Sequence, residues 1–292
     1  MHIRYGYTLD VVCEAPAELV TGLDVHSSRR ADITEPDDMH ATALANGAAL
    51  DCGEIGVDRF GNLFRRLAVP AGGARLTAQG IIHDSGFADP PATDARAMAA
   101  GDLPEEVRLY LDESLLCPQA GFVSLANVLG ASAPAGWSTV QAIVDHVRQR
   151  LRLDPAAGVT GRTAADAIGA GGGSLDDLVH VAIALCRVAG IPARYATGYL
   201  AETGGEAPAG GGFAVWFEAY LDGRWWMFDV VADQPRIGRI LIAEGRDAGD
   251  AAVVGSSAPF RIARQEVVAE EVTGDRFPVT SRERRERWVA RR

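Results

Sequence analysis

The chain lacks long apolar runs: no stretch reaches the about 18 consecutive apolar residues of a membrane-spanning helix. Its first residues, MHIRYGYTLDVV, alternate between polar and apolar types as a strand does, and contain no apolar core of the kind found in signal peptides. We therefore expect neither a membrane segment nor a secretion signal, and a cytoplasmic protein without a membrane partner.

Cysteine is scarce as well. The four residues, Cys13, Cys52, Cys117 and Cys186, show no CxxC pair and no spacing typical of metal ligands. This pattern argues against a disulfide framework and against a zinc site. We expect four reduced thiols.

Positive charge is in deficit, with 28 Lys and Arg against 39 Asp and Glu and a formal net charge of −11. A general nucleic-acid partner is excluded on this ground, because non-specific binding to phosphates needs a positive surface. The 292 residues, 48% of them hydrophobic, are enough for one large domain or two moderate ones.

The order of the patterns predicts an α+β chain. Residues 1–90 read as short alternating strands with Gly-containing turns, which favours an antiparallel β-sandwich. A Pro- and Ala-rich break follows, and residues 100–272 then read as several helices and a second set of strands, that is, helices packed on an antiparallel sheet. Residues 273–292 are an Arg-rich tail.

Local signals place some of these elements. Ser138 and Gln141 have the spacing of a capping box before an amphipathic helix, and Asp222-Gly223 is typical of a tight hairpin turn. The Gly-rich segment 200–212 is predicted as a loop, which either closes over a ligand or serves only as a surface connection.

Three segments resemble one known family. They are GSLDDLVHVAIALCRVAGIPARYATGYL at 173–200, VWFEAYLDGRWWMFD at 215–229 and PRIGRILIAEGRDAGDAAVV at 235–254. The chain is similar to the bacterial transglutaminase-like superfamily up to about Val272. This resemblance implies a papain-like domain after the β-sandwich, with a Cys at the start of a buried helix and a His and an Asp on neighbouring strands.

The family's catalytic residues are incomplete in this resemblance. Its Cys falls on Leu175, its His falls on Ala214, and only its Asp remains, as Asp229. Acyl transfer needs a nucleophile and an adjacent base, so the resemblance implies that Cys-dependent chemistry is lost. Ser174 is the nearest hydroxyl, and its alternative role is to cap the helix with Asp177 as its acidic partner.

Charged residues remain on the same helix. His180 lies four residues after Asp176 and three after Asp177, so a carboxylate–imidazole contact for acid–base chemistry is within reach on one face. The alternative is that His180 is a core histidine and Asp177 orders the helix N-terminus. Asp176 stands where relatives carry Arg, and it is expected to face Asp229.

Ala214, Trp216 and Glu218 alternate on one strand and are therefore expected on one face. An acidic cleft with Trp walls would suit an amine-bearing molecule. Asp and Glu are ligand types for hard metal ions, but nothing in their spacing demands a metal, and we predict neither a metal nor a cofactor.

Two functions stay open. The first is a repurposed enzyme of specialised biosynthesis, acting on a small-molecule, peptidyl or carrier-borne substrate, with Asp176, Asp177, His180 and Asp229 as catalytic residues. Its substrate-binding residues would be Ser174, Leu175, Ala214, Trp216 and Glu218. The second is a catalytically inactive pseudoenzyme that binds or scaffolds a partner. The sequence does not determine the oligomeric state.

Overall fold

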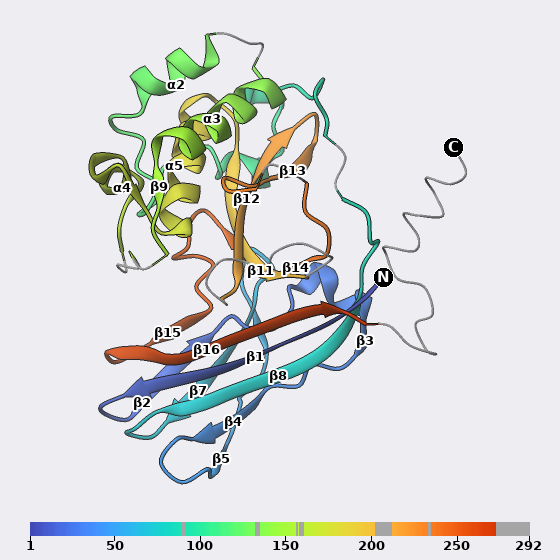
Figure 1. Cartoon of the computed structure of the whole chain (residues 1–292), viewed down its shortest axis with the longest axis vertical. Coiled ribbons are helices and arrows are strands. Elements are labelled where there is room, and N and C mark those ends of the chain that lie inside the picture. Colours follow the sequence, from blue (N-terminus) through green and yellow to red (C-terminus); the bar gives the residue numbers. More distant parts are fainter. Residues whose placement is uncertain are drawn as a thin grey trace.

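The computed structural model describes residues 1–88, 91–131, 135–155, 157, 161–201, 212–232 and 235–272. They form two lobes, a β-sandwich and a sheet with helices, arranged along the long axis of the molecule (Figure 1). The predicted α+β class is confirmed. Most of the loop predicted at 200–212 and all of the tail at 273–292 lie outside the described residues.

The first sheet of the sandwich is built around β1. Alternate residues of β1, among them Ile3, Leu9 and Val11, are completely buried, as period-two patterning requires for a strand with one face on a core. Its strands are all paired antiparallel. In spatial order they are β16 (Phe260–Glu271), β1 (His2–Cys13), β8 (Ala74–His83), β4 (His40–Ala43) and β5 (Ala49–Leu50), with β3 (Ile33–Glu35) also paired to β8.

The second sheet packs its apolar residues into the same core, where Leu19 and Leu67 join Leu9 in one hydrophobic cluster. A turn at Gly61 connects two of its strands, and Gly61 has the positive φ, 87°, that such turns favour. The strands are β15 (Val254–Ser256), β2 (Ala17–Thr21), β7 (Leu63–Val69) and β6 (Gly56–Val57), in that order.

The C-terminal strands correct the predicted domain division. The sequence pattern assigned them to the core at 100–272, but β15 pairs with β2, and β16 pairs with β1 from Ile3 opposite Glu271 to Cys13 opposite Phe260. Alternation predicts a strand but does not say which sheet it joins, and the edge of β1 offered unpaired backbone groups. The sandwich is therefore built from both ends of the described chain.

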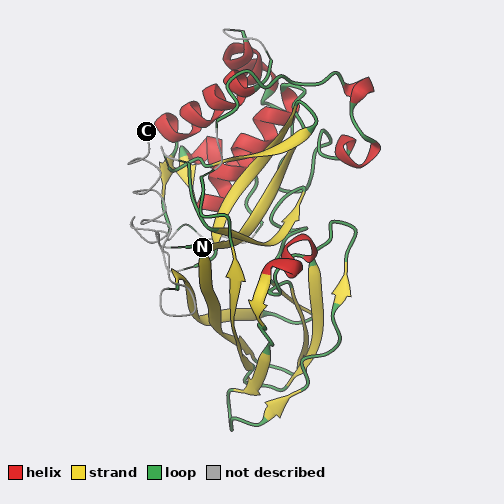
Figure 2. Ribbon diagram, turned by 90° about the vertical axis from the view of Figure 1, so that its right-hand side faces the viewer, coloured by secondary structure: helices red, strands yellow, loops and turns green. Residues whose placement is uncertain are grey.

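The second lobe is a four-stranded antiparallel sheet with helices packed against it (Figure 2). The predicted second set of strands is confirmed, and the predicted hairpin turn has positive φ at both Asp222 (47°) and Gly223 (81°). The strand order is β13 (Arg224–Phe228), β12 (Ala214–Leu221), β11 (Ala193–Leu200) and β14 (Arg239–Gly245).

The helices lie mostly between residues 105 and 188. None of those in the described part of the chain combines the length and the apolar character that crossing a bilayer requires. The α-helices are α1 (Glu105–Arg108), α2 (Val123–Gly130), α3 (Trp137–Arg150), α4 (Ala164–Ala170) and α5 (Leu175–Val188). The remaining short elements are the 3-10 helices η1 (Ser27–Asp32) and η2 (Ala100–Asp102) and the paired strands β9 (Arg152–Leu153) and β10 (Gly172–Gly173).

Helix α5 is the centre of this lobe. Its residues from Asp177 to Arg187 are all buried, because α2, α3 and α4 cover it on one side and β11 and β12 on the other. A helix that is apolar nearly all round is stable only in such an interior position. Its N-terminus is thereby held at one end of the sheet.

The start of α3 corrects a second prediction. The helix begins at Trp137 with Gly136 as its N-cap, so Ser138 is already its second residue and does not cap it. A Cβ at Gly136 would lie 2.3 Å from the carbonyl oxygen of Ala95, and only glycine permits this close approach. The indole of Trp137 packs on Phe228 at 4.7 Å, which draws this residue into the first turn.

Candidate functional site

The N-terminus of α5 is closed by a capping box. The Ser174 hydroxyl accepts the N–H of Asp177 at 3.3 Å, and the Asp177 carboxylate accepts the N–H of Ser174 at 2.9 Å. A Cβ at Gly173 would lie 2.3 Å from that carboxylate, so the preceding glycine is required. Arg162 also approaches Asp177, at 3.5 Å. The alternative interpretation of Ser174 and Asp177, as a helix cap, is confirmed.

Leu175 and Asp176 are the first two residues of α5, and both are half-buried. Oδ1 of Asp176 accepts a hydrogen bond from the Tyr195 hydroxyl at 2.5 Å. Asp176 is thus held by a residue of β11 rather than by His180. The sequence missed Tyr195, because its relation to Asp176 depends on how α5 packs on the sheet.

His180 faces the interior and is only 2% exposed. Its Nε2 accepts the backbone N–H of Ala248 at 3.1 Å, and its ring lies 5.5 Å from that of Tyr195. Burial lowers the pKa of His180, so the ring is neutral at neutral pH. With Nε2 accepting, the proton is on Nδ1, which is buried without a hydrogen-bond partner among the described residues. This geometry agrees with the alternative of a core histidine.

One cavity, with a volume of about 260 Å³, opens at the N-terminus of α5. We call it the α5 cavity. It brings together the three positions to which the resemblance assigns catalytic residues, although they are far apart in the sequence. The predicted site residues that line it are Ser174, Leu175, Asp176, Ala214 and Asp229.

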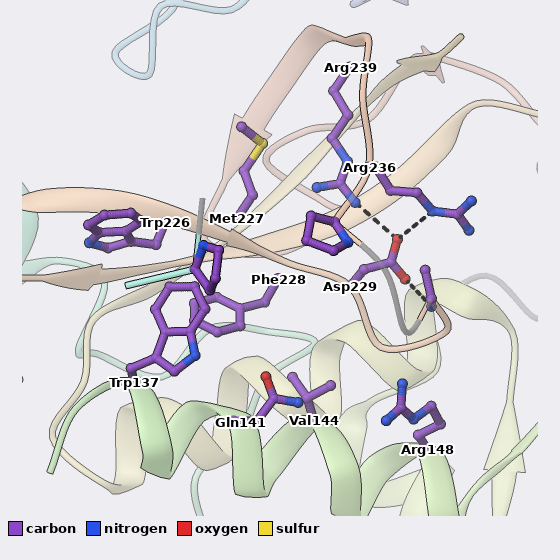
Figure 3. A pocket seen from close by; sticks show the side chains of 13 residues that line it. Trp137, Gln141, Val144, Arg148, Trp226, Met227, Phe228, Asp229, Arg236 and Arg239 are labelled. Carbon is purple, nitrogen blue, oxygen red and sulfur yellow. Dashed lines mark hydrogen bonds and ion pairs between the residues drawn. The ribbon is translucent and has the colours of Figure 1, made fainter. Parts of the chain in front are cut away.

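Asp229 is fully engaged. Its Oδ1 accepts the backbone N–H groups of Val231 and Ala232, both at 2.9 Å. Its Oδ2 lies 3.0 Å from Arg239 and 3.5 Å from Arg236 (Figure 3).

Arg236 and Arg239 also line the α5 cavity, which therefore carries two Asp and two Arg side chains. The prediction of an acidic cleft was wrong for this reason. The signal was present in the segment PRIGRI, where two Arg residues follow Asp229 closely in the sequence.

Trp216 and Glu218 do not line the α5 cavity. Glu218 accepts hydrogen bonds from Arg194, at 2.6 and 2.8 Å, and from the Trp216 indole at 3.2 Å. Arg194 also donates to Glu244, a residue that the sequence did not single out. Both predicted substrate-binding residues are therefore part of a buried charge cluster on the sheet, away from this cavity.

No cysteine lines the α5 cavity, and all four cysteines belong to the described residues. Cys13 is in β1, and Cys52 donates to the carbonyl of Met39. Burial raises the pKa of both Cys117 and Cys186 to about 12, which leaves these thiols protonated at neutral pH. Within the described residues, no three His, Cys, Asp or Glu side chains are grouped so that they could hold a metal ion.

Both the sequence and the fold of this chain are similar to those of known proteins. Residues 124–230 match the model of the transglutaminase-like superfamily. The fold is similar to that of a candidate cysteine protease from Cytophaga hutchinsonii, with 21% sequence identity and a TM-score of 0.76 over 96% of this chain and 94% of that chain. At this identity the likeness shows the fold alone.

A weaker match is the periplasmic domain of TgpA from Pseudomonas aeruginosa, with 14% identity and a TM-score of 0.37 over 75% of this chain and 88% of that chain. No curated protein sequence matches the chain. The matched residues 124–230 contain α5, β11, β12 and β13, and with them Leu175, Ala214 and Asp229. Residues 124–230 therefore form a transglutaminase-like domain.

Proposed function

We propose that this protein does not transfer acyl groups through a cysteine. Instead, the α5 cavity binds an amine-bearing substrate, small or carrier-borne, and Asp176 accepts a proton from it without a covalent intermediate. The observation that carries the proposal is the meeting of Leu175, Asp176 and Ala214 in one cavity.

The loss of covalent chemistry follows from side-chain type. By resemblance, the family's Cys and His fall on Leu175 and Ala214, and a hydrocarbon side chain neither attacks a carbonyl carbon nor accepts a proton. The thiols of Cys117 and Cys186 are no replacement, since both are buried and protonated. Ser174 is engaged in the helix cap.

Asp176 differs from Asp229 in its partners. Asp229 is ion-paired with two guanidinium groups, whereas Asp176 accepts a hydrogen bond from the neutral hydroxyl of Tyr195. Asp176 therefore keeps its negative charge available at the wall of the cavity, where a substrate ammonium group would be attracted to it. A carboxylate held in hydrogen-bonding reach of a bound amine is also placed to receive its proton.

Binding is tested by calorimetry with n-butylamine, cadaverine and a set of dipeptides with free amino groups. We expect Asp176→Asn to weaken the affinity for those that bind by about tenfold, the loss of one charged hydrogen-bonding partner. Glu106→Gln, at an exposed site in α1, is the matched control and should leave the affinity unchanged. Equal affinity of the parent and Asp176→Asn for every amine would overturn the proposal.

Turnover is tested separately by mass spectrometry of the same mixtures. We expect the parent to cyclise or hydrolyse one of the dipeptides, with Asp176 taking the proton of the attacking amine or water and with water or the free amine as the leaving group. This product should persist after treatment with iodoacetamide and disappear in Asp176→Asn. A product that is abolished by alkylation would restore a cysteine mechanism and refute this one.

A second candidate function is a binding protein without catalysis. It is favoured by the engagement of the other predicted catalytic groups in structural contacts: Asp177 in the helix cap, His180 with the backbone of Ala248, and Asp229 with Arg236 and Arg239. Amine binding that depends on Asp176, combined with no product from any mixture, would support this second function.

A further inference from the structure

A second cavity, of about 300 Å³, lies between α3 and β13 and adjoins the α5 cavity. We call it the α3 cavity. Its volume is at the lower end of the range of small-molecule sites. The side chains that give it chemical character are drawn in Figure 3 and are Trp137, Arg148, Trp226, Phe228, Arg236 and Arg239.

One side of the α3 cavity is aromatic. The rings of Trp137 and Trp226 meet edge to face at 5.7 Å, and Trp137 also packs on Phe228 at 4.7 Å. Both tryptophans remain half-buried although they line the cavity. The Trp226 N–H donates to the carbonyl of Leu221 at 3.1 Å, so its polar group is already satisfied. This side therefore offers flat apolar surface to a ligand.

The other side carries an excess of positive charge. Arg236 and Arg239 both approach the same carboxylate oxygen of Asp229, whose other oxygen is occupied by backbone N–H groups. Arg148 adds a third guanidinium from α3 and pairs with Asp145 on its own helix. Among the described residues, three guanidinium groups and one carboxylate, that of Asp229, thus line the cavity.

Arg236 is the group with spare donor capacity. Its Nε is buried and has no hydrogen-bond acceptor among the described residues, since its 3.5 Å contact with Asp229 is an ion pair and not a hydrogen bond. A buried N–H without an acceptor is unfavourable. The Arg236 side chain as a whole is 32% exposed, so a ligand oxygen can approach its guanidinium group although it does not reach the buried Nε.

We propose that the α3 cavity binds a small organic carboxylate with a flat apolar body. The body lies against Trp137 and Trp226, and the carboxylate lies at Arg236 and Arg239, since a guanidinium matches the two oxygens of a carboxylate in geometry and charge. This proposal uses no contact of Asp176, so it stands independently of the amine site.

The test uses the full chain and 3-phenylpropanoate as the probe, with binding measured by calorimetry. The neutral isostere 3-phenylpropanamide measures the contribution of the negative charge, and acetate, which has no ring, measures the contribution of the ring. Inorganic phosphate reports general anion binding. We expect the phenylpropanoate dissociation constant to be at least about tenfold lower than those of the other three. Absence of binding by all four probes would overturn the proposal, and so would phosphate binding as tightly as phenylpropanoate.

The variants are Arg236→Gln and, as a second test away from the ion pair, Trp137→Phe. We expect Arg236→Gln to weaken phenylpropanoate binding by about tenfold or more, and Trp137→Phe to weaken it by a smaller factor. Arg66→Gln, at a residue 61% exposed on β7, is the matched control. Circular dichroism of each variant verifies folding, and parent-like affinity in a folded Arg236→Gln protein would contradict the assignment.

Discussion

The hydroxyl of Tyr195 in β11 donates its hydrogen to the carboxylate of Asp176 and thereby ties the first turn of α5 to an inner strand of the sheet. Burial, and next the charge of Asp176, hold the pKa of Tyr195 well above its usual range. The hydroxyl therefore remains a donor throughout the neutral range. The position of the cavity carboxylate is fixed by this one contact.

Tyr195→Phe tests the contribution of that contact to stability. The change deletes a buried hydrogen bond to a charged acceptor, so we expect a loss of about 1.5–3 kcal/mol in the free energy of unfolding. Urea denaturation measures it. Asp176→Asn keeps an acceptor for the hydroxyl and should cost less; equal losses in the two variants would argue against this account.

Ser174→Ala tests the capping box of α5. Loss of an N-cap hydroxyl lowers the free energy of unfolding by about 1 kcal/mol. Ser174→Asp retains an acceptor for the N–H of Asp177 and should be close to the parent. Thr163→Ala removes the equivalent hydroxyl from the capping box of α4 and is the matched comparison in the same urea titration. An unaffected Ser174→Ala protein would show that packing alone holds this helix.

A thiol introduced at Leu175 should be reactive where the native cysteines are not. The helix N-terminus favours a thiolate, and in Leu175→Cys/Ala214→His a neighbouring imidazole can add to that effect. We expect iodoacetamide to alkylate residue 175 at pH near neutrality much faster than Cys117 or Cys186, as followed by mass spectrometry. Val215→Cys lies in the same cavity but not at the helix end and provides the control. Similar rates for the two introduced thiols would contradict the expectation.

Glu244 should make stability depend on pH. Burial raises its pKa from 4.5 to about 7, against the opposing attraction of Arg194. Between pH 4.5 and about 7, Glu244 holds a proton in the folded protein that it has released in the unfolded chain. The contribution of Glu244 to stability is therefore greatest below pH 4.5, the pKa in the unfolded chain, and falls as the pH rises toward 7. Glu244→Gln should remove this part of the slope, which reaches at most about 1.4 kcal/mol per pH unit. Urea titrations across the window measure it, and parallel slopes in parent and variant would refute it.

The sequence predicted what depends on local pattern. The alternation of β1, the turn at Asp222 and Gly223, and the cap formed by Ser174 and Asp177 involve residues close together in the chain, and each was found as expected. The meeting of Leu175, Ala214 and Asp229 in one cavity could be predicted because the resemblance implied a fold in which these three positions lie close together.

Contacts between distant residues were not predictable in the same way. The contact of Asp176 with Tyr195 depends on the packing of α5 against the sheet, which no spacing encodes. The sequence does place Arg236 and Arg239 close after Asp229, but it does not say that their side chains turn back to this carboxylate. Trp216 and Glu218 do alternate with Ala214, but that regularity fixes only a face of the strand and not the cavity that the face reaches. The same limit applies to Ser138, which lies two residues after the N-cap of α3, Gly136, and therefore does not cap the helix.

The pairing of β1 with β16 has a consequence for how the chain is made. Strand β1 is synthesised roughly 250 residues before its partner β16, an interval that at ordinary rates of synthesis takes on the order of 10–50 s. Throughout that time one edge of β1 can pair with another nascent chain. The sandwich therefore completes its folding late in synthesis. The yield of soluble protein should depend on how well the edge of β1 that later pairs with β16 is protected from other chains.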